Sequence, residues 1–266
     1  MSNNSEILKQ TLSNSYLHEQ WVNTYIDDSK ILYDLVFDEL KKFLWSSGRN
    51  DVLDAGCGNG INTLRLLQRG FNVTACDFSN AALDLSRTFL RKNYDLDNYK
   101  LLKEDILSLS FNDAEFDVVL CWGVLMHIYE IEKALDELCR VTKTDGYVII
   151  CEVSMKALDS ILIQALKYMF RQYDRSIKSR FGKEYWSETQ AGKILVRKTD
   201  IDMLINFMSE KGFTLVNKIP GQFSQIYTKM KKDFLRKLIL KFNLFWFKHL
   251  KFIGPSVEQV LVFKKK

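Results

Sequence analysis

The sequence predicts an α/β fold in which helices cover both faces of a mostly parallel sheet. Between residues 49 and 154, short runs of β-branched and apolar residues alternate with stretches whose apolar residues recur at helical spacing. Several runs are apolar throughout, which is typical of parallel strands buried on both faces. A glycine-rich turn separates the first run from the first helix, as in many nucleotide-binding folds. We therefore expect a doubly wound α/β domain.

The core elements follow one another in strict alternation. Expected strands cover 52–53, 71–76, 99–102, 117–122 and 147–153, and expected helices cover 62–69, 81–92 and 131–142. Strands joined by helical crossovers in this way run parallel. We take residues 49–154 as the ligand-binding core.

The flanking segments have a different pattern. Residues 1–48 show helical apolar spacing and are expected to form an N-terminal helical cap. Residues 155–198 are rich in Tyr, Phe, Met and Arg and lack strand character before 194–196, so we expect a helical lid insertion over the C-terminal edge of the sheet. Residues 199–266 supply a helix over 200–211, strands over 213–216 and 257–263, and a basic helix over 229–251.

Length and composition favour one domain over residues 1–266. The chain is 47% hydrophobic and has only two prolines, so it can bury a core and has no proline-rich linker. No basic and apolar leader and no run of about 18 apolar residues is legible, and the five cysteines are odd in number. These features predict a cytoplasmic protein with reduced thiols. With three histidines and no CxxC pair, we expect no metal site.

Positive charge is concentrated near the C-terminus. Residues 229–266 carry 11 Lys and Arg against two acidic residues, although the whole chain is only +5. In a helix over 234–253, one apolar stripe (Leu235, Leu238, Ile239, Phe242, Phe245, Trp246, Leu250 and Ile253) is expected to dock on the core. A second row, Leu240, Leu244 and Phe247, then lies exposed among lysines. This pattern suggests peripheral contact with an anionic membrane, with a dimer contact or a solvated face as alternatives; the oligomeric state stays open.

The segment from Asp54 to Gly60 is the most informative motif. It reads Asp-Ala-Gly-Cys-Gly-Asn-Gly, with glycines at every second position where a strand turns into a helix. A dinucleotide fingerprint would require glycine at position 61, which is Ile61, and no P-loop lysine follows. The carboxylate of Asp54 would repel a pyrophosphate and favours a cationic group instead.

Two further acids complete the outline of a ligand. Asp77 ends the second strand, where a carboxylate can accept hydrogen bonds from both hydroxyls of a ribose; its alternative role is to cap the following helix. Glu104, Asp105 and Ile106 follow the third strand, where a carboxylate can accept from an adenine amino group and Ile106 can pack on the ring. The ligand so described has adenine, ribose and a cationic end.

With these motifs in order, residues 49–154 resemble the class I S-adenosylmethionine-dependent methyltransferases. The resemblance implies a Rossmann-like, seven-stranded sheet whose last strand is antiparallel. It also implies S-adenosylmethionine as the cofactor. The cofactor-binding residues it points to are Asp54, Gly56, Cys57, Gly58, Asp77, Phe78, Asp105, Ile106, Cys121 and Trp122. Cys57 is expected to be a small filler within this motif rather than a nucleophile.

The segment after the fourth strand bears on the acceptor. It reads Trp122-Gly-Val-Leu-Met-His127 and lacks the Asn/Asp-Pro-Pro-Tyr/Phe sequence of enzymes that methylate amino groups of nucleic acids, so nucleic acid is disfavoured as an acceptor. His127 stands near the edge where acceptors bind and is our candidate catalytic base, with simple packing as the alternative. Tyr16, Trp21 and Tyr25 form an aromatic cluster in the cap that could lie near a sulfonium, or in the core.

These features predict methyl transfer to an oxygen of a small-molecule acceptor, such as a sugar, a phosphate or a lipid-linked intermediate. One alternative is an RNA methyltransferase that uses the basic C-terminal tail. Another is a cofactor-binding protein without catalysis.

Overall fold

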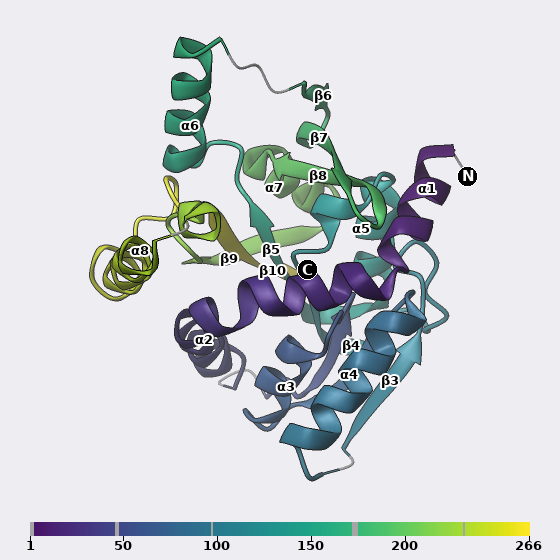
Figure 1. Ribbon diagram of the computed structural model, residues 1–266. Helices are drawn as coiled ribbons and strands as arrows, with labels where there is room; N and C mark the ends of the chain where they lie inside the picture. Colours follow the sequence, from purple (N-terminus) through teal and green to yellow (C-terminus); the bar gives the residue numbers. More distant parts are fainter. Residues whose placement is uncertain (1–2, 46–47, 97, 172–174, 231) are drawn as a thin grey trace.

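A seven-stranded sheet organises the molecule, as Figure 1 shows. The computed structural model describes residues 3–45, 48–96, 98–171, 175–230 and 232–266, and within these ranges the side chains at 3, 22–29, 45, 166 and 229 are not described. The strand order is β3-β2-β1-β4-β5-β10-β9. The strands are β1 (Asp51–Ala55), β2 (Asn72–Asp77), β3 (Tyr99–Lys103), β4 (Phe116–Trp122), β5 (Thr142–Val153), β9 (Phe213–Pro220) and β10 (Glu258–Lys265).

Only β10 runs against its neighbours in this sheet. It pairs antiparallel with both β5 and β9, while the pairs among β1 to β5 are parallel. This confirms the predicted Rossmann-like α/β fold with seven strands and an antiparallel last strand. The reversal of strand order at β1 and β4 leaves a crevice beyond their carboxyl ends, where ligands bind in open α/β sheets.

Alternate residues of each strand face two separate hydrophobic layers. Leu53, Val119 and Ile150 pack with α5 (Ile131–Val141) and α7 (Ile201–Glu210). Their chain neighbours Val52 and Val118 face the other layer. That layer contains α2 (Ser15–Trp45), α3 (Ile61–Leu67) and α4 (Asn80–Asn93). Helices on both faces explain why the central strands are apolar throughout.

The described part of the segment 155–198 differs from the expected helical lid. It begins with α6 (Leu158–Met169) but continues as a three-stranded antiparallel sheet of β6 (Ile177–Ser179), β7 (Gly182–Thr189) and β8 (Gly192–Thr199). Ile194 and Leu195 of this sheet are buried against α1 (Asn3–Leu12), which is distant in sequence. Because these strands gain their burial from remote partners, local periodicity did not reveal them.

The basic C-terminal helix is also oriented differently from the prediction. It consists of α8 (Asp233–Phe245) and a π-helical turn (Trp246–Leu250). Phe247 is buried in the core and Leu244 packs beside it, whereas most of the predicted docking stripe is exposed. Trp246 of the predicted stripe is buried as expected, but most of the two rows exchange roles, because Asn243, next to Leu244, is buried and hydrogen-bonds to both N and O of Ser224. No helix in the described ranges is long and apolar enough to cross a membrane.

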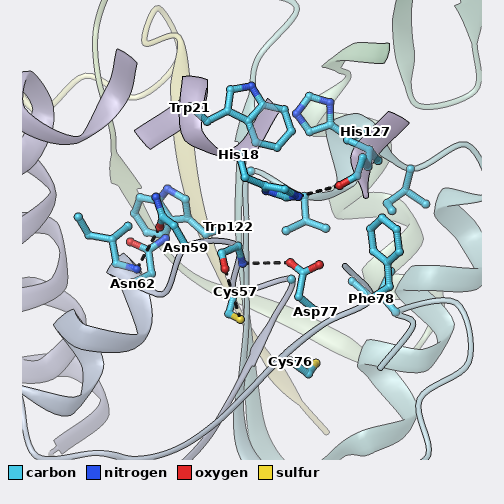
Figure 2. A pocket seen from close by; sticks show the side chains of 18 of the residues that line it. His18, Trp21, Cys57, Asn59, Asn62, Cys76, Asp77, Phe78, Trp122 and His127 are labelled. Carbon is cyan, nitrogen blue, oxygen red and sulfur yellow. Dashed lines mark hydrogen bonds between the residues drawn. The ribbon is translucent and has the colours of Figure 1, made fainter. Parts of the chain in front are cut away.

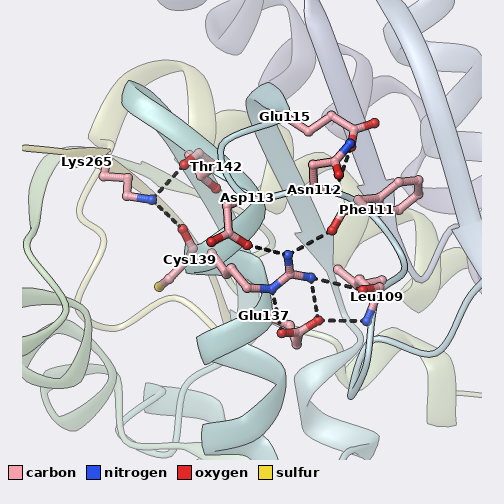
Figure 3. A network of polar contacts seen from close by, with 10 residues as sticks. Leu109, Phe111, Asn112, Asp113, Glu115, Glu137, Cys139, Thr142 and Lys265 are labelled. Carbon is pink, nitrogen blue, oxygen red and sulfur yellow. Dashed lines mark hydrogen bonds and ion pairs between the residues drawn. The ribbon is translucent and has the colours of Figure 1, made fainter.

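A polar network fixes the connection between β3 and β4 to α5 (Figure 3). The guanidinium of Arg140 donates to the carbonyl oxygens of Leu109 and Phe111 and to the carboxylates of Asp113 and Glu137. Nearby, Lys265 donates to two carbonyls at the end of α5, a favourable place for a cation. The network holds the loop that follows Glu104 and Ile106, two residues that line the cavity described next.

Candidate active site

The glycine-rich loop joins β1 to α3 at the central crevice. Gly56, Gly58 and Gly60 all have positive φ, between 55° and 81°, a region that favours glycine. A Cβ atom on Gly56 would lie 2.5 Å from Cγ2 of Val124, whereas one on Gly58 would meet no atom within 4 Å. Gly56 is thus required for packing, and Gly58 leaves open space for a ligand to approach the backbone.

A cavity of about 210 Å³ lies beside this loop, and Figure 2 shows its side chains. Nine of the residues predicted from the sequence line it, near the carboxyl ends of β1, β2, β3 and β4 and on α2. They are Trp21, Gly56, Cys57, Gly58, Asp77, Phe78, Ile106, Trp122 and His127. The fold therefore brings most of the predicted site together.

Asp77 closes the end of β2 and is nearly buried. Its two carboxylate oxygens accept hydrogen bonds from the backbone N–H groups of Gly58, at 3.0 Å, and Ser79, at 2.9 Å. Burial raises the pKa of this carboxyl, and the backbone donors oppose that shift. The cap of α4 is Ser79, whose hydroxyl oxygen accepts from Ala82 N. Asp77 is thus not the helix cap, and its carboxylate faces the cavity.

Other predicted residues do not line this cavity. Asp54 is buried beneath the loop, where Thr63 Oγ1 donates to it at 2.7 Å and burial raises its pKa to about 6. Asp105 pairs with Lys9 and accepts from Leu107 N, while its neighbour Glu104 lines the cavity instead.

Three remaining predictions have different outcomes. Cys121 is fully buried in the layer that contains α5 and α7, whereas the next residue, Trp122, points to the opposite face of the strand and lines the cavity. Tyr16 is 44% exposed and does not line the cavity. The side chain of Tyr25 lies outside the described residues.

A second cavity, of about 490 Å³, adjoins the first. The two share Trp21, Asn59, Ile61, Asn62, Trp122, Gly123 and His127. The other lining side chains are mixed. Leu17, Met126, Val153, Ile194 and Val196 are apolar, whereas the polar and charged ones include Gln20, Arg65, Glu152, Thr189, Gln225 and Glu258. The molecule therefore has two adjoining spaces, the smaller at the glycine loop and the larger roofed by β8.

His127 lies at the junction of the two cavities. Its ring stacks on Trp21, with centroids 5.3 Å apart, and its Nδ1 lies 2.7 Å from the carbonyl oxygen of Leu195. Because a carbonyl can only accept, Nδ1 carries the proton and Nε2 is left as an acceptor. Burial, together with the nearby charge of Arg197, lowers the pKa of the imidazole to about 4. His127 is therefore neutral near pH 7.

Arg197 holds the turn that carries His127. Its guanidinium donates to the carbonyl oxygens of Leu125 and Ile128, at 2.7 and 2.9 Å, and pairs with Glu184 at 2.8 Å. The side chain is 1% exposed, and a buried charge of this kind needs such partners. The β7–β8 hairpin thus positions His127 from outside the core fold.

Glu152, at the end of β5, is the functional candidate that our sequence reasoning missed. It is 1% exposed, and its Oε2 accepts from Thr199 Oγ1 at 3.3 Å, while Oε1 has no hydrogen-bond partner in the described structure. Burial raises the pKa of its carboxyl to about 8. The available signal was a single acid in the otherwise apolar run 147–153, at the sheet edge where acceptors bind.

Comparison with known proteins identifies the central part of the chain. Residues 53–150 match the sequence family described as "Methyltransferase domain". Residues 53–150 therefore resemble a methyltransferase domain. Members of this family use S-adenosylmethionine, and the match covers the glycine loop, Asp77 and His127.

Curated relatives named as methyltransferases are similar to part of this chain. The ubiquinone biosynthesis O-methyltransferase of Rickettsia bellii (strain OSU 85-389) is 30% identical over 124 residues, covering 47% of this chain and 50% of that protein. The demethylmenaquinone methyltransferase of Clavibacter sepedonicus is 36% identical over 103 residues, covering 39% and 41% of the two chains. The chain therefore aligns with about half the length of these relatives.

A solved structure extends the similarity of fold beyond the methyltransferase domain. Magnesium protoporphyrin IX methyltransferase from Synechocystis PCC 6803, crystallised with bound S-adenosylhomocysteine, superposes with a TM-score of 0.64. It is 16% identical and covers 98% of this chain and 100% of that chain. At this identity the likeness establishes the fold.

The cavity at the glycine loop has the features that S-adenosylmethionine requires. Gly58 and Gly123 have positive φ and open space where a Cβ would stand, so the backbone can approach a ligand. Asp77 can accept from a ribose, and Phe78 and Ile106 offer apolar surfaces for a purine. In the part of the chain that the structure describes, no group of His, Cys, Asp and Glu is arranged to hold a metal ion.

Proposed function

We propose that this protein transfers the methyl group of S-adenosylmethionine to an oxygen of a small-molecule acceptor. The observation that carries the proposal is the pair of adjoining cavities, which share Trp21, Trp122, Gly123 and His127. The smaller cavity suits the cofactor and the larger suits the acceptor. Methyl transfer needs these two molecules to be held in line with water excluded.

The acceptor is proposed to be largely apolar, with an ionisable hydroxyl group. Trp21, Trp122 and Met126 supply apolar lining, and Glu152 offers a polar group at one wall. Two relatives have names that refer to quinone compounds, namely ubiquinone and demethylmenaquinone. A ring with a hydroxyl group, carried on an apolar molecule, fits these features better than a free sugar does.

The cofactor supplies the electrophilic methyl group, and the chain must bind, orient and deprotonate the acceptor. We assign proton acceptance to Glu152 rather than to His127. A base is most effective when its pKa lies near the working pH. The pKa of Glu152 is about 8, whereas that of His127 is about 4. His127 instead presents Nε2 as a hydrogen-bond acceptor that orients the hydroxyl.

The direct test is a methyl-transfer assay with the purified protein. S-adenosylmethionine labelled in its methyl group is incubated with a catechol, a reduced short-chain quinone, a monosaccharide or an RNA transcript. The expected result is labelled methyl ether on the catechol or quinol, with stoichiometric S-adenosylhomocysteine. Labelled RNA would contradict the proposal and favour an RNA methyltransferase. Cofactor binding by calorimetry without turnover on any acceptor would contradict it too, and would favour a cofactor-binding protein without catalysis. Absence of cofactor binding would reject the proposed function and both of these alternatives.

A further inference from the structure

Two helices on one side of the molecule present apolar side chains to solvent. On α8, Phe234 is 76% exposed and Leu238 53%. On α6, Leu162 is 55% exposed and Met169 69%. Figure 1 places α6 and α8 on the same side of the molecule. We call these outward surfaces the docking face, which comprises Leu158, Ile161, Leu162, Met169, Phe170, Phe234, Leu235, Leu238, Phe242 and Phe245.

The apolar residues of each helix fall on one side at helical spacing. On α8, Leu235, Leu238, Phe242 and Phe245 follow at steps of three and four residues, while Leu244 on the other side packs on the core. The helix thus uses one side to attach to the protein and leaves Leu238 and Phe245 of the other side exposed, while Phe242 also contacts Phe223. Monomeric proteins rarely leave a contiguous apolar patch exposed without a partner.

Positive charge accompanies this face. Lys237 and Lys241 lie one turn apart beside the apolar row of α8, and Lys248 is exposed in the next turns. The one acid of α8 is Asp233, which pairs with Lys237. Apolar and aromatic residues flanked by lysines match the chemistry of an anionic lipid surface, where side chains enter the interface and cations meet headgroups.

The same charge disfavours a second copy as the partner. A symmetric dimer places the same patch of each copy against the other. On this face, such a contact would bring two lysine rows together with only Asp233 on each α8 to compensate. Like charges brought together in an interface weaken it.

The docking face is connected to the wall of the larger cavity. Gln225 lines that cavity, and its backbone N–H donates to Asp159 of α6 at 3.3 Å. The neighbouring Ser224 donates to Asp159 and also exchanges hydrogen bonds with Asn243 of α8. Both helices are thus tied to a segment that borders the acceptor space.

We propose that the docking face binds an anionic lipid membrane and so brings the acceptor cavity to molecules held in that membrane. The inference that this face binds lipid depends only on its exposed apolar and basic residues. The delivery of an acceptor rests on the proposed function.

The test is co-sedimentation with vesicles of phosphatidylglycerol and phosphatidylcholine, or of phosphatidylcholine alone. We expect binding to rise with the anionic fraction and to fall with added salt. Two variants, Phe234→Gln with Leu238→Gln and Lys241→Glu with Lys248→Glu, should each lower the partition coefficient by about tenfold or more. Leu162→Gln with Met169→Gln should lower it less, because these side chains have no lysine row beside them.

Matched controls come from the opposite edge of the sheet. Leu96→Gln with Leu102→Gln removes exposed apolar residues, and Lys92→Glu with Lys100→Glu changes the net charge equally. These variants should bind vesicles like the wild type. Circular dichroism and cofactor titration, both measured without lipid, establish that each variant is folded and report on the proposed function separately.

Several results would overturn the docking proposal. One is no sedimentation of the wild type at low salt on strongly anionic vesicles, and another is equal losses in the α8 variants and the controls. A third is a wild-type dimer that Phe234→Gln with Leu238→Gln converts to monomer with vesicle binding unchanged, which would assign the face to a contact between copies. Normal cofactor binding beside any of these results would leave the proposed function intact.

Discussion

Replacing Glu152 by Gln should reduce activity and change how stability depends on pH. Burial raises the pKa of this carboxyl from 4.5 to about 8 in the folded protein. Between these values the folded state holds a proton that the unfolded chain has released. The free energy of unfolding must therefore fall as pH rises, by about 1.4 kcal/mol per pH unit from this group. This loss of folding stability is complete above about pH 8 and absent below pH 4.5.

Glutamine stays neutral across that pH range, so the free energy of unfolding of the variant lacks this part of the pH dependence. Between about pH 5 and pH 8, the free energy of unfolding of Glu152→Gln should rise relative to that of the wild type by a total on the order of 4 kcal/mol. Its turnover should fall by about 10²-fold or more, because the amide cannot accept the proton. The wild-type kcat should rise with pH to an inflection near 8 that the variant lacks.

The measurements are denaturant unfolding at several pH values and kcat on the same protein samples. Glu188→Gln is the control, since its carboxylate is 82% exposed on β7 and should affect neither quantity. Parallel stability curves for wild type and Glu152→Gln would refute the buried, protonated carboxyl. Unchanged turnover would refute its role as the base.

Three other substitutions test the site. Asp77→Ala should weaken S-adenosylmethionine binding by about 1.5–3 kcal/mol in a calorimetric titration, and an affinity within twofold of the wild type would remove the ribose assignment. Gly58→Ala should also weaken cofactor binding, with circular dichroism unchanged, because a methyl group there enters open space at φ +55°; normal affinity would mean that no ligand approaches this backbone. His127→Ala should lower kcat by about 10²-fold with cofactor affinity preserved, because the hydroxyl of the acceptor loses the group that orients it, and a normal kcat would assign the ring to packing against Trp21.

The central fold and the cavity proposed for the cofactor follow from local patterns that a sequence displays directly. Alternating apolar strands and amphipathic helices predicted the sheet, because burial on one or two faces imposes its period on the chain. The glycines of the loop and Asp77 were recognisable because backbone approach and ribose binding each require one residue type at one place. Nine of the predicted residues accordingly line one cavity.

Residues whose role depends on distant partners were not predictable in this way. Asp54 has the right position in the motif, yet Thr63 occupies its carboxylate below the loop. Glu152 has its proposed role only in the folded chain, which buries its carboxyl group and places Thr199 beside it. Burial and desolvation, which set its pKa, are properties of the packed molecule and not of a residue type.

The sequence by itself determined the α/β core, the order of its elements and the place of the cavity that we propose for the cofactor. Tertiary structure alone decided which face of α8 meets the core and which meets solvent, since both faces are apolar enough to dock. Contact with Ser224 through Asn243 selected one of them. Tertiary structure also decided that residues 177–199 contain three strands. The burial that stabilises these strands comes from α1 and from the turn at His127, both far away in the chain.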